Sequence, residues 1–131
     1  MNITQTENKI ENNRPQREKV TTREIRVGVI GCGYWGPKLA RNFHEIPTST
    51  LVMVSDLQQE RLQQIKNLYP TVKTTQNYEE MLGSDIDAVV IATPVRMHYP
   101  MAKKALLAGK HVLVEKPITA RSDHAWELVE F

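Results

Sequence analysis

Three glycines stand at a spacing that could bind phosphates. Gly31, Gly33 and Gly36 form a G-x-G-x-x-G pattern directly after a short apolar segment. In such a turn the first glycine permits a tight bend, the second lets a pyrophosphate approach the backbone, and the third lets a helix pack closely. The N-terminus of that helix presents free N–H groups to the phosphates. The spacing predicts a dinucleotide-binding turn, with a plain strand-to-helix turn as the alternative.

The residues between these glycines are Cys32, Tyr34 and Trp35. Tyr34 and Trp35 are expected to be cofactor-binding residues that cover the phosphate turn, or to pack against a partner surface. A helix N-terminus favours a reactive thiolate, which makes Cys32 a candidate nucleophile. A small apolar filler is the favoured interpretation of Cys32.

Asp56 follows the second apolar segment, about 20 positions after Gly36. A carboxylate at this separation accepts hydrogen bonds from the 2′- and 3′-hydroxyls of an adenosine ribose. Its charge would repel a 2′-phosphate, so the sequence favours NAD over NADP as the cofactor. Arg61 is close enough in sequence to keep NADP as the less favoured alternative. Asp56 could also cap the following helix, and the two roles are compatible.

Thr93 and Pro94 follow the most apolar segment of the chain. Ligands of open α/β sheets bind beside the carboxyl ends of the strands, so we expect both residues to face the nicotinamide end of a cofactor. His98, in the first turn of the next helix, is expected either to contribute to cofactor binding or to be structural.

Glu115, Lys116 and Pro117 follow the last apolar segment. Pro117 ends that strand and fixes the local backbone, which aims Lys116 into the same crevice as Thr93 and Pro94. A lysine there could bond a substrate hydroxyl, with its pKa held down by the positive ring of a cofactor. Glu115 is included among the expected cofactor-binding residues. The alternative for Lys116 is a solvated side chain at a strand end.

The elements that must position these residues alternate between strands and helices. Strands are expected at 25–30, 51–55, 72–74, 88–92 and 111–115. Helices are expected at 36–45, 58–69, 78–82 and 99–108, with a last helix from 123 through 131 capped by Ser122. This order predicts an α/β fold with a doubly wound parallel sheet in the order 3-2-1-4-5 and right-handed crossovers.

The last predicted helix carries an apolar face, formed by Trp126, Leu128, Val129 and Phe131. No segment follows it that could cover this face. We therefore expect the chain to be the front part of a longer protein.

Composition narrows the class of protein further. The chain has 131 residues, 40% hydrophobic and 24% charged, which is typical of one globular domain, here 24–131. The polar segment 1–23 has too few apolar residues to bury and is expected to be disordered. The net charge of +2, from 17 basic and 15 acidic residues, argues against a nucleic-acid partner.

Cysteine content and hydropathy indicate the cellular compartment of the protein. The single cysteine excludes an intrachain disulfide framework. No apolar run approaches the ~20 residues of a membrane helix, and the N-terminus lacks the apolar segment of a signal peptide. A cytoplasmic protein with no membrane partner is therefore expected. His44, His111 and His124 show no metal-like spacing, so no metal site is predicted.

Three segments together resemble the Gfo/Idh/MocA oxidoreductase family over 25–131. They are VGVIGCGYWGPKLARNF, VSD and VVIATPVRMHYPMAKKALLAGKHVLVEKP. The resemblance implies an NAD(P)-binding Rossmann domain, with Lys116 as the family's catalytic-site lysine. It also implies a second α/β domain that binds a sugar or cyclitol and mediates oligomers, so a homo-oligomer is possible. The GCGYWGP-x-LARNF form looks most like the branch that oxidises nucleotide-linked sugars at C3, such as UDP-N-acetylglucosaminuronate dehydrogenases.

That second domain is absent from this sequence. We therefore expect the chain to be the NAD-binding part of an enzyme that transfers a hydride between nicotinamide and a sugar or nucleotide-sugar hydroxyl, inactive in isolation. One alternative is a non-enzymatic NAD-binding or sensing module that acts through a partner. Another is a Rossmann-like protein for a different adenosyl ligand, such as a methyltransferase, in which Glu115, Lys116 and Pro117 would have no role.

Overall fold

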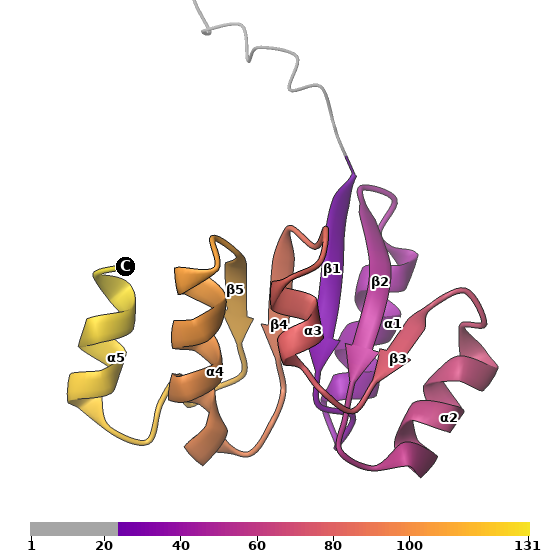
Figure 1. Cartoon of the computed structure of the whole chain (residues 1–131). Helices are drawn as coiled ribbons and strands as arrows, with labels where there is room; N and C mark the ends of the chain where they lie inside the picture. The colour runs from indigo at the N-terminus through magenta and orange to yellow at the C-terminus, as the bar shows by residue number, and fades with distance from the viewer. Residues whose placement is uncertain (1–23) are drawn as a thin grey trace, which may run out of the picture.

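Five parallel strands form the sheet in the computed structural model, which describes residues 24–131 (Figure 1). In chain order they are β1 (Ile25–Ile30), β2 (Ser49–Ser55), β3 (Lys73–Thr75), β4 (Ala88–Ile91) and β5 (His111–Val114). Across the sheet their order is β3-β2-β1-β4-β5, which confirms the predicted order and fold class. The disorder expected for 1–23 lies outside the described residues.

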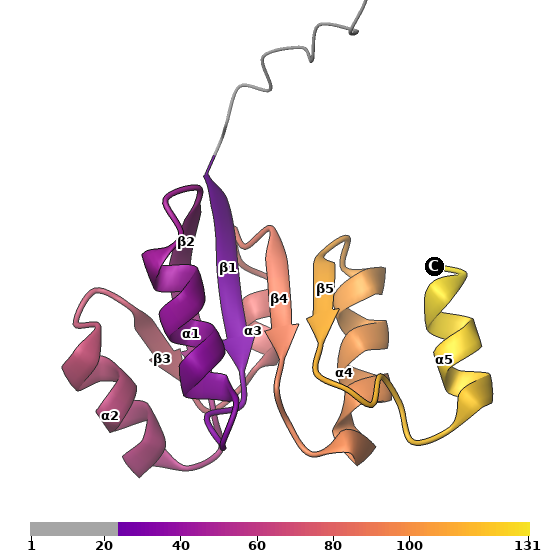
Figure 2. The same cartoon turned by 180° about the vertical axis from the view of Figure 1, so that it is seen from behind.

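Helices cover both faces of this sheet (Figures 1 and 2). One face carries α1 (Gly36–Glu45) and α2 (Gln59–Leu68). The opposite face carries α3 (Glu79–Leu82) and α4 (Val95–Leu107), and α5 (Ser122–Val129) packs beside α4. Within 24–131, no helix is long and apolar enough to cross a membrane.

The alternation of side chains along the central strands produces a core on each face. In β1, Val27 and Val29 join the cluster under α1 and α2, whereas Ile30 joins the cluster under α3 and α4. In β4, Val90 points to the first cluster and Val89 to the second. Successive side chains of a strand point to opposite faces, so continuous apolar strands are what a sheet covered on both sides requires.

Helix α4 begins at Val95, about one turn earlier than the sequence predicted. Pro94 is its N-cap residue with an extended backbone (ψ 144°), and Pro100 lies inside the helix. An interior proline removes one hydrogen bond and costs a helix about 3 kcal/mol. The burial of His98 and Met101 on the sheet side offsets that cost, so tertiary packing decides where the helix starts.

Helix α5 differs from its prediction at both ends. Ser122 is its first helical residue rather than its cap, because Arg121 holds the extended N-cap conformation (φ −131°, ψ 136°) without a side-chain cap bond. Arg121 pairs instead with Asp123 of the first turn, at 2.8 Å between Nη2 and Oδ2. The helix ends at Val129 and does not run through Phe131. The other boundaries differ from the predicted ones by about two residues at most, which is normal for helix and strand ends.

Candidate cofactor-binding site

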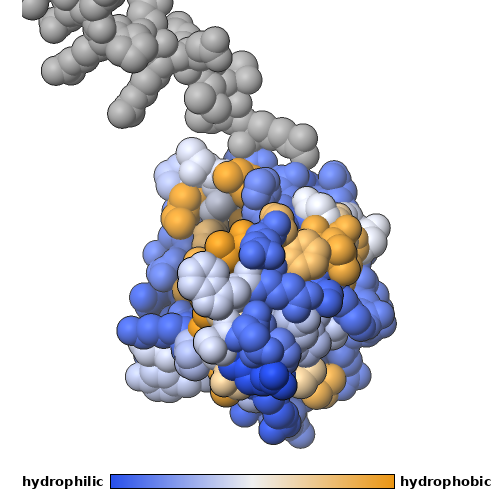
Figure 3. Space-filling view, turned by 90° about the vertical axis from the view of Figure 1, so that its left-hand side faces the viewer, coloured by the Kyte–Doolittle hydropathy of each residue, from blue (hydrophilic) through white to orange (hydrophobic). Residues whose placement is uncertain are grey.

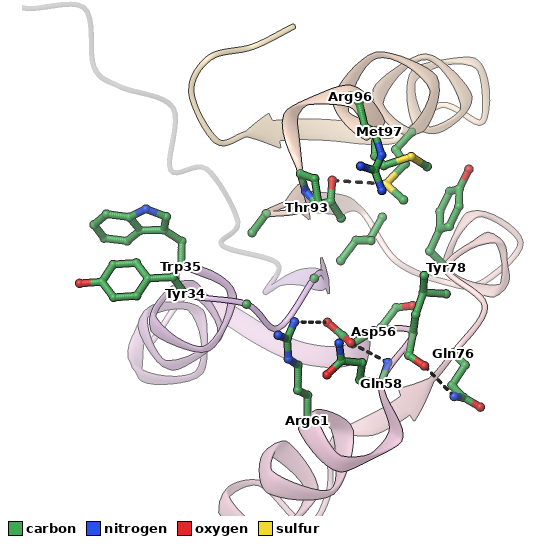
Figure 4. A pocket seen from close by; sticks show the side chains of 18 residues that line it. Tyr34, Trp35, Asp56, Gln58, Arg61, Gln76, Tyr78, Thr93, Arg96 and Met97 are labelled. Carbon is green, nitrogen blue, oxygen red and sulfur yellow. Dashed lines mark hydrogen bonds and ion pairs between the residues drawn. The ribbon is translucent and has the colours of Figure 1, made fainter. Parts of the chain in front are cut away.

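A cavity of about 600 Å³ opens at the carboxyl ends of β1, β2 and β4 (Figure 4). It brings together most of the predicted cofactor-binding residues, namely Gly31, Gly33, Tyr34, Trp35, Asp56, Thr93 and Pro94. Gly36, His98, Glu115 and Lys116 are not among the residues that line it. The predicted site therefore divides into a group on the cavity wall and a group behind or beside it.

Two of the three glycines serve the packing of the chain itself. Gly31 has a φ of +99°, and a Cβ there would lie 2.6 Å from the carbonyl oxygen of Ala92. A Cβ on Gly36 would lie 1.7 Å from the carbonyl oxygen of Gly31. No side chain fits either position without moving the backbone, so these two glycines shape the turn.

Gly33 is different, because its own protein surroundings do not require a glycine. The nearest atom to a Cβ placed there is Nη1 of Arg61, at 3.9 Å, and the position lines the cavity. A side chain would project into open space that a ligand can otherwise occupy. This is the space that a pyrophosphate needs for close approach to the backbone.

The N-terminus of α1 completes the turn. Trp35 is its N-cap residue and makes no side-chain cap bond, and the first turn contains Pro37 and no acidic residue. The first N–H groups of a helix lack partners within the helix, so an uncapped start leaves them available to phosphate oxygens.

Tyr34 and Trp35 stand at the edge of the cavity and are 74% and 51% exposed. Their rings pack edge to face with centroids 5.0 Å apart, and Figure 4 shows both pointing away from the cavity centre. Nζ of Lys38 lies 3.8 Å from the Tyr34 centroid and 4.9 Å from that of Trp35. The aromatic pair thus holds a cation beside the phosphate turn.

Asp56 is fixed at the end of β2 by backbone donors. Its Oδ2 accepts from the N–H of Cys32 and its Oδ1 from the N–H of Gln58, each at 2.7 Å. The bond to Gln58 lies just before α2, which explains why Asp56 also looks like a helix-capping residue. A carboxylate has about four acceptor sites, so each oxygen retains capacity for a ribose hydroxyl.

Arg61, from α2, lies on the other side of this carboxylate. Its Nη1 is 3.8 Å from Oδ2 of Asp56, and the side chains are 44% and 9% exposed, respectively (Figure 4). The Asp56 end of the cavity therefore holds a nearly buried anion with a more exposed cation beside it.

Cys32 is 5% exposed and belongs to the core under α1 and α2. Burial, and to a smaller extent the nearby carboxylate of Asp56, together raise the pKa of its thiol to about 12. The thiol is therefore protonated at neutral pH, which fits the apolar-filler interpretation and not a nucleophile.

His98 lies behind the cavity wall and is 2% exposed. Its Nε2 is 2.8 Å from the carbonyl oxygen of Thr93, and its Nδ1 is 2.8 Å from that of Pro117. Both ring nitrogens thus face backbone carbonyls, which corresponds to the structural alternative for this residue.

Glu115 and Lys116 extend the chain past β5. The Glu115 N–H donates to the carbonyl oxygen of Ile91 at 2.9 Å, continuing the ladder between β4 and β5. Lys116 is exposed and joined to Pro117 by a cis peptide bond. The expected crevice shared with Thr93 and Pro94 does not extend to Lys116, because the cavity ends on the β4 side. No group of three His, Cys, Asp or Glu side chains within 24–131 could hold a metal ion.

Several cavity residues were not predicted from the sequence: Leu57, Gln76, Tyr78, Arg96 and Met97. Leu57 is 83% exposed directly after Asp56, an apolar side chain at a site where the fold does not bury it. Its position next to Asp56 was a usable signal. The others come from the segments after β3 and β4, and only the three-dimensional fold brings them to the same wall.

Comparison with known proteins decides the family. The model of the Gfo/Idh/MocA oxidoreductase family, NAD-binding Rossmann fold, matches residues 25–131. This chain belongs to that family. It is an NAD(P)-binding oxidoreductase domain, as the resemblance of its sequence implied.

Relatives of known sequence are longer than this chain. A protein from Shewanella sp. (strain ANA-3) named glycosyl hydrolase family 109 protein 2 is 37% identical over 117 residues, covering 82% of this chain and 26% of that protein. The uncharacterized oxidoreductase YrbE of Bacillus subtilis (strain 168) is 33% identical over 107 residues, covering 81% and 31%. The chain thus spans about a quarter to a third of the length of these relatives.

Several solved structures of similar fold contain nicotinamide cofactors. Scyllo-inositol dehydrogenase from Lactobacillus casei, with bound NAD(H) and scyllo-inositol, is 29% identical with a TM-score of 0.75, covering 82% of this chain and 32% of that one. The 3-ketoreductase KijD10 from Actinomadura kijaniata, in complex with NADP and TDP-benzene, is 29% identical with a TM-score of 0.75, covering 82% and 33%.

Proposed function

We propose that this chain forms the cofactor side of an oxidoreductase that transfers a hydride between NAD and a hydroxyl-bearing carbon of a sugar or nucleotide sugar. The observation that carries the proposal is the open space above Gly33 next to a rigidly held Asp56. Phosphates need the first feature and a ribose needs the second, and both lie on one cavity wall.

The residues that would hold NAD follow from this wall. The backbone at Gly33 and the uncapped start of α1 would bind the pyrophosphate, and Asp56 would accept from the adenosine ribose. Leu57 and Thr93 both line the cavity. In this proposal Leu57 would offer an apolar surface to the adenosine, and Thr93 would lie toward the nicotinamide. Bound NAD supplies the hydride acceptor, and the protein supplies position and charge.

Lys116 is the proposed catalytic residue. It follows β5, whose neighbour β4 leads to Thr93, so the two segments leave adjacent strands at the same edge. An ammonium Nζ there would donate a hydrogen bond to the reacting substrate hydroxyl and steady its developing charge. Its exposure means that this charge acts through water until further protein surface covers it.

The substrate class rests on similarity. The similar proteins named above act on or bind an inositol and a nucleotide-linked group, and the GCGYWGP form points to the nucleotide-sugar branch. For the whole protein, a cytoplasmic location and a homo-oligomer belong to the same proposal.

The purified chain tests this proposal. We expect calorimetric titration to show NAD binding, with NADP weaker. We expect no NADH formation faster than about one turnover per minute with UDP-N-acetylglucosaminuronate, other nucleotide sugars or inositol at millimolar concentration. Holding a hydroxyl in line with the nicotinamide accounts for up to about 7–11 kcal/mol of the barrier, and the exposed Lys116 cannot supply that alone.

The outcomes separate the alternatives. Absence of NAD binding, or a preference for NADP, contradicts the cofactor assignment. Turnover faster than about one per minute contradicts the expectation that the chain binds NAD but cannot oxidise a sugar on its own. NAD binding by a longer protein that contains this chain, without any sugar oxidation, favours the non-enzymatic NAD-binding module.

A further inference from the structure

His98 joins two segments that carry different parts of the proposed site. Its ring nitrogens lie 2.8 Å from the carbonyl oxygens of Thr93 and Pro117, and the side chain is 2% exposed. Thr93 lines the cavity, and Pro117 directly follows Lys116. One buried side chain therefore contacts the cofactor wall and the loop of the proposed catalytic lysine.

The sheet itself does not hold these two segments together. The ladder between β4 and β5 ends with the bond from the Glu115 N–H to the Ile91 carbonyl oxygen. Beyond that bond, His98 is the cross-link that the described structure provides between the two segments. Segments past the end of a ladder open more easily than the strands before them, so a cross-link there controls their geometry.

Imidazole suits this position for a geometric reason. Its two nitrogens point in nearly opposite directions and can reach two carbonyls at once. A neutral ring donates to one of them, and both are bonded when both nitrogens carry hydrogen. The amide group of Gln or Asn donates from a single nitrogen, so it cannot span the same two oxygens.

We propose that His98 is a positioning residue that sets the Lys116 loop against the cofactor wall, through Pro117 on one side and Thr93 on the other. It acts without touching the cofactor, because it does not line the cavity. Its importance for the reaction rests on the proposed function, whereas the coupling of the two segments does not.

The variant His98→Gln tests the coupling. We expect the backbone amides of residues 115, 116, 118 and 119 to exchange at least about tenfold faster, and the amide of Thr93 to exchange faster as well, while those of β1 and β2 keep their rates. We expect NAD affinity to fall about five- to thirtyfold, the effect of leaving the Thr93 carbonyl on the cavity wall without its partner.

Ala105→Gly is the matched control. Ala105 is fully buried on the same helix, contacts neither carbonyl, and its replacement weakens α4 directly. We expect this variant to lower the unfolding midpoint without changing NAD affinity or the relative exchange at 115–119. If both variants change those amides equally, His98 contributes only helix stability and the inference is wrong.

The wild-type chain supplies a test that needs no variant to fold. A ring N–H of His98 that donates to a buried carbonyl should give a slowly exchanging imidazole proton in NMR spectra, with contacts to both Thr93 and Pro117. Absence of such a proton, or contacts to only one segment, overturns the inference. Both readouts stand even if the chain does not bind NAD, so the two proposals fail separately.

Discussion

The site lies along the carboxyl ends of the strands, and its two sides differ: Asp56 follows β2 on one side, and Lys116 follows β5 on the other. At the Asp56 end, the carboxylate is 9% exposed and bonded by two backbone N–H groups, and α1 and α2 cover the strands behind it. At the Lys116 end, β5 and α5 present large apolar side chains to solvent, including Leu113, Trp126 and Val129 at 50%, 70% and 69% exposure. Figure 3 shows this flank, where hydrophobic patches interrupt a polar surface.

In the proposed function, the Asp56 end binds the cofactor and the Lys116 end contacts the substrate, so this difference distinguishes the two parts of the site. At the Asp56 end, backbone N–H groups of this chain fix the carboxylate, and α1 and α2 pack over the strands behind it, so the carboxylate is preorganised for a ligand. At the Lys116 end, Leu113, Trp126 and Val129 stay at least half exposed, so their burial within this chain stabilises that end less. The site is therefore more rigid at the Asp56 end, which would hold adenosine and pyrophosphate. It is less constrained at the Lys116 end, where a substrate hydroxyl would react.

The largest expected contrast is in stability. Leu62, in α2, is 1% exposed, and Leu62→Ala should lower the free energy of unfolding by about 2–5 kcal/mol, through lost burial and the cavity left behind. Trp126→Ala should change it by about 0.5 kcal/mol or less, because the Trp126 side chain is already mostly in water. Urea unfolding followed by circular dichroism measures both.

Leu62→Met is the control, since it conserves volume and should cost less than about 1.5 kcal/mol. A loss for Trp126→Ala as large as that for Leu62→Ala would mean that the α5 flank is covered in solution. The two ends would then be equally constrained.

The sequence was sufficient for the features that depend on local pattern. The alternation of predicted strands and helices along the chain predicted the parallel sheet and its strand order. The spacing of Gly31, Gly33 and Gly36 predicted the turn between the first strand and the first helix. It was insufficient where packing overrides local preference. The fourth helix was predicted to begin at Tyr99, yet α4 begins at Val95, and the burial of His98 and Met101 stabilises this earlier start.

The site shows the same division. Asp56 was predictable because its distance from the glycine turn is fixed by the length of one helix and one strand. The positions of His98 and Lys116 outside the cavity lining were not, because they depend on how the segments after β4 and β5 leave the sheet. Tyr78 and Met97 follow β3 and β4, and only the folded arrangement of these strands brings both residues to the same cavity, which a linear pattern does not contain.

Cofactor affinity sharpens the comparison between the two ends. Asp56→Ala should weaken NAD binding by about 10–150-fold, since a hydrogen bond to a charged acceptor is worth about 1.5–3 kcal/mol. It should also reduce the difference in affinity between NAD and NADP. Lys116→Ala, at the exposed end, should change NAD affinity by less than about threefold. Calorimetric titration of both variants, each first shown to be folded, gives the two numbers.

Asp56→Asn is the companion variant, because it keeps the shape of the side chain and removes its charge. We expect it to fall between wild type and Asp56→Ala for NAD. Equal losses for Asp56→Ala and Lys116→Ala would show that the Lys116 end contributes as much to cofactor binding, which contradicts the division of the site.

The smallest expected effect lies within the Asp56 end and concerns the choice between NAD and NADP. A 2′-phosphate carries up to two negative charges and is repelled by Asp56. Arg61 can offset part of that repulsion, because its guanidinium lies 3.8 Å from the Asp56 carboxylate and is 44% exposed. Arg61→Gln should therefore weaken NADP binding by about three- to tenfold and NAD binding by less than about twofold.

Arg96→Gln, on the opposite wall of the cavity, is the charge-matched control and should not discriminate between the cofactors. Titrations at low and high salt add a second criterion, since the Arg61 effect on NADP should shrink as ions screen an exposed charge. If Arg61→Gln instead weakens NAD as much as NADP, Arg61 acts by holding Asp56 in place, and the selectivity of this end comes from the carboxylate alone.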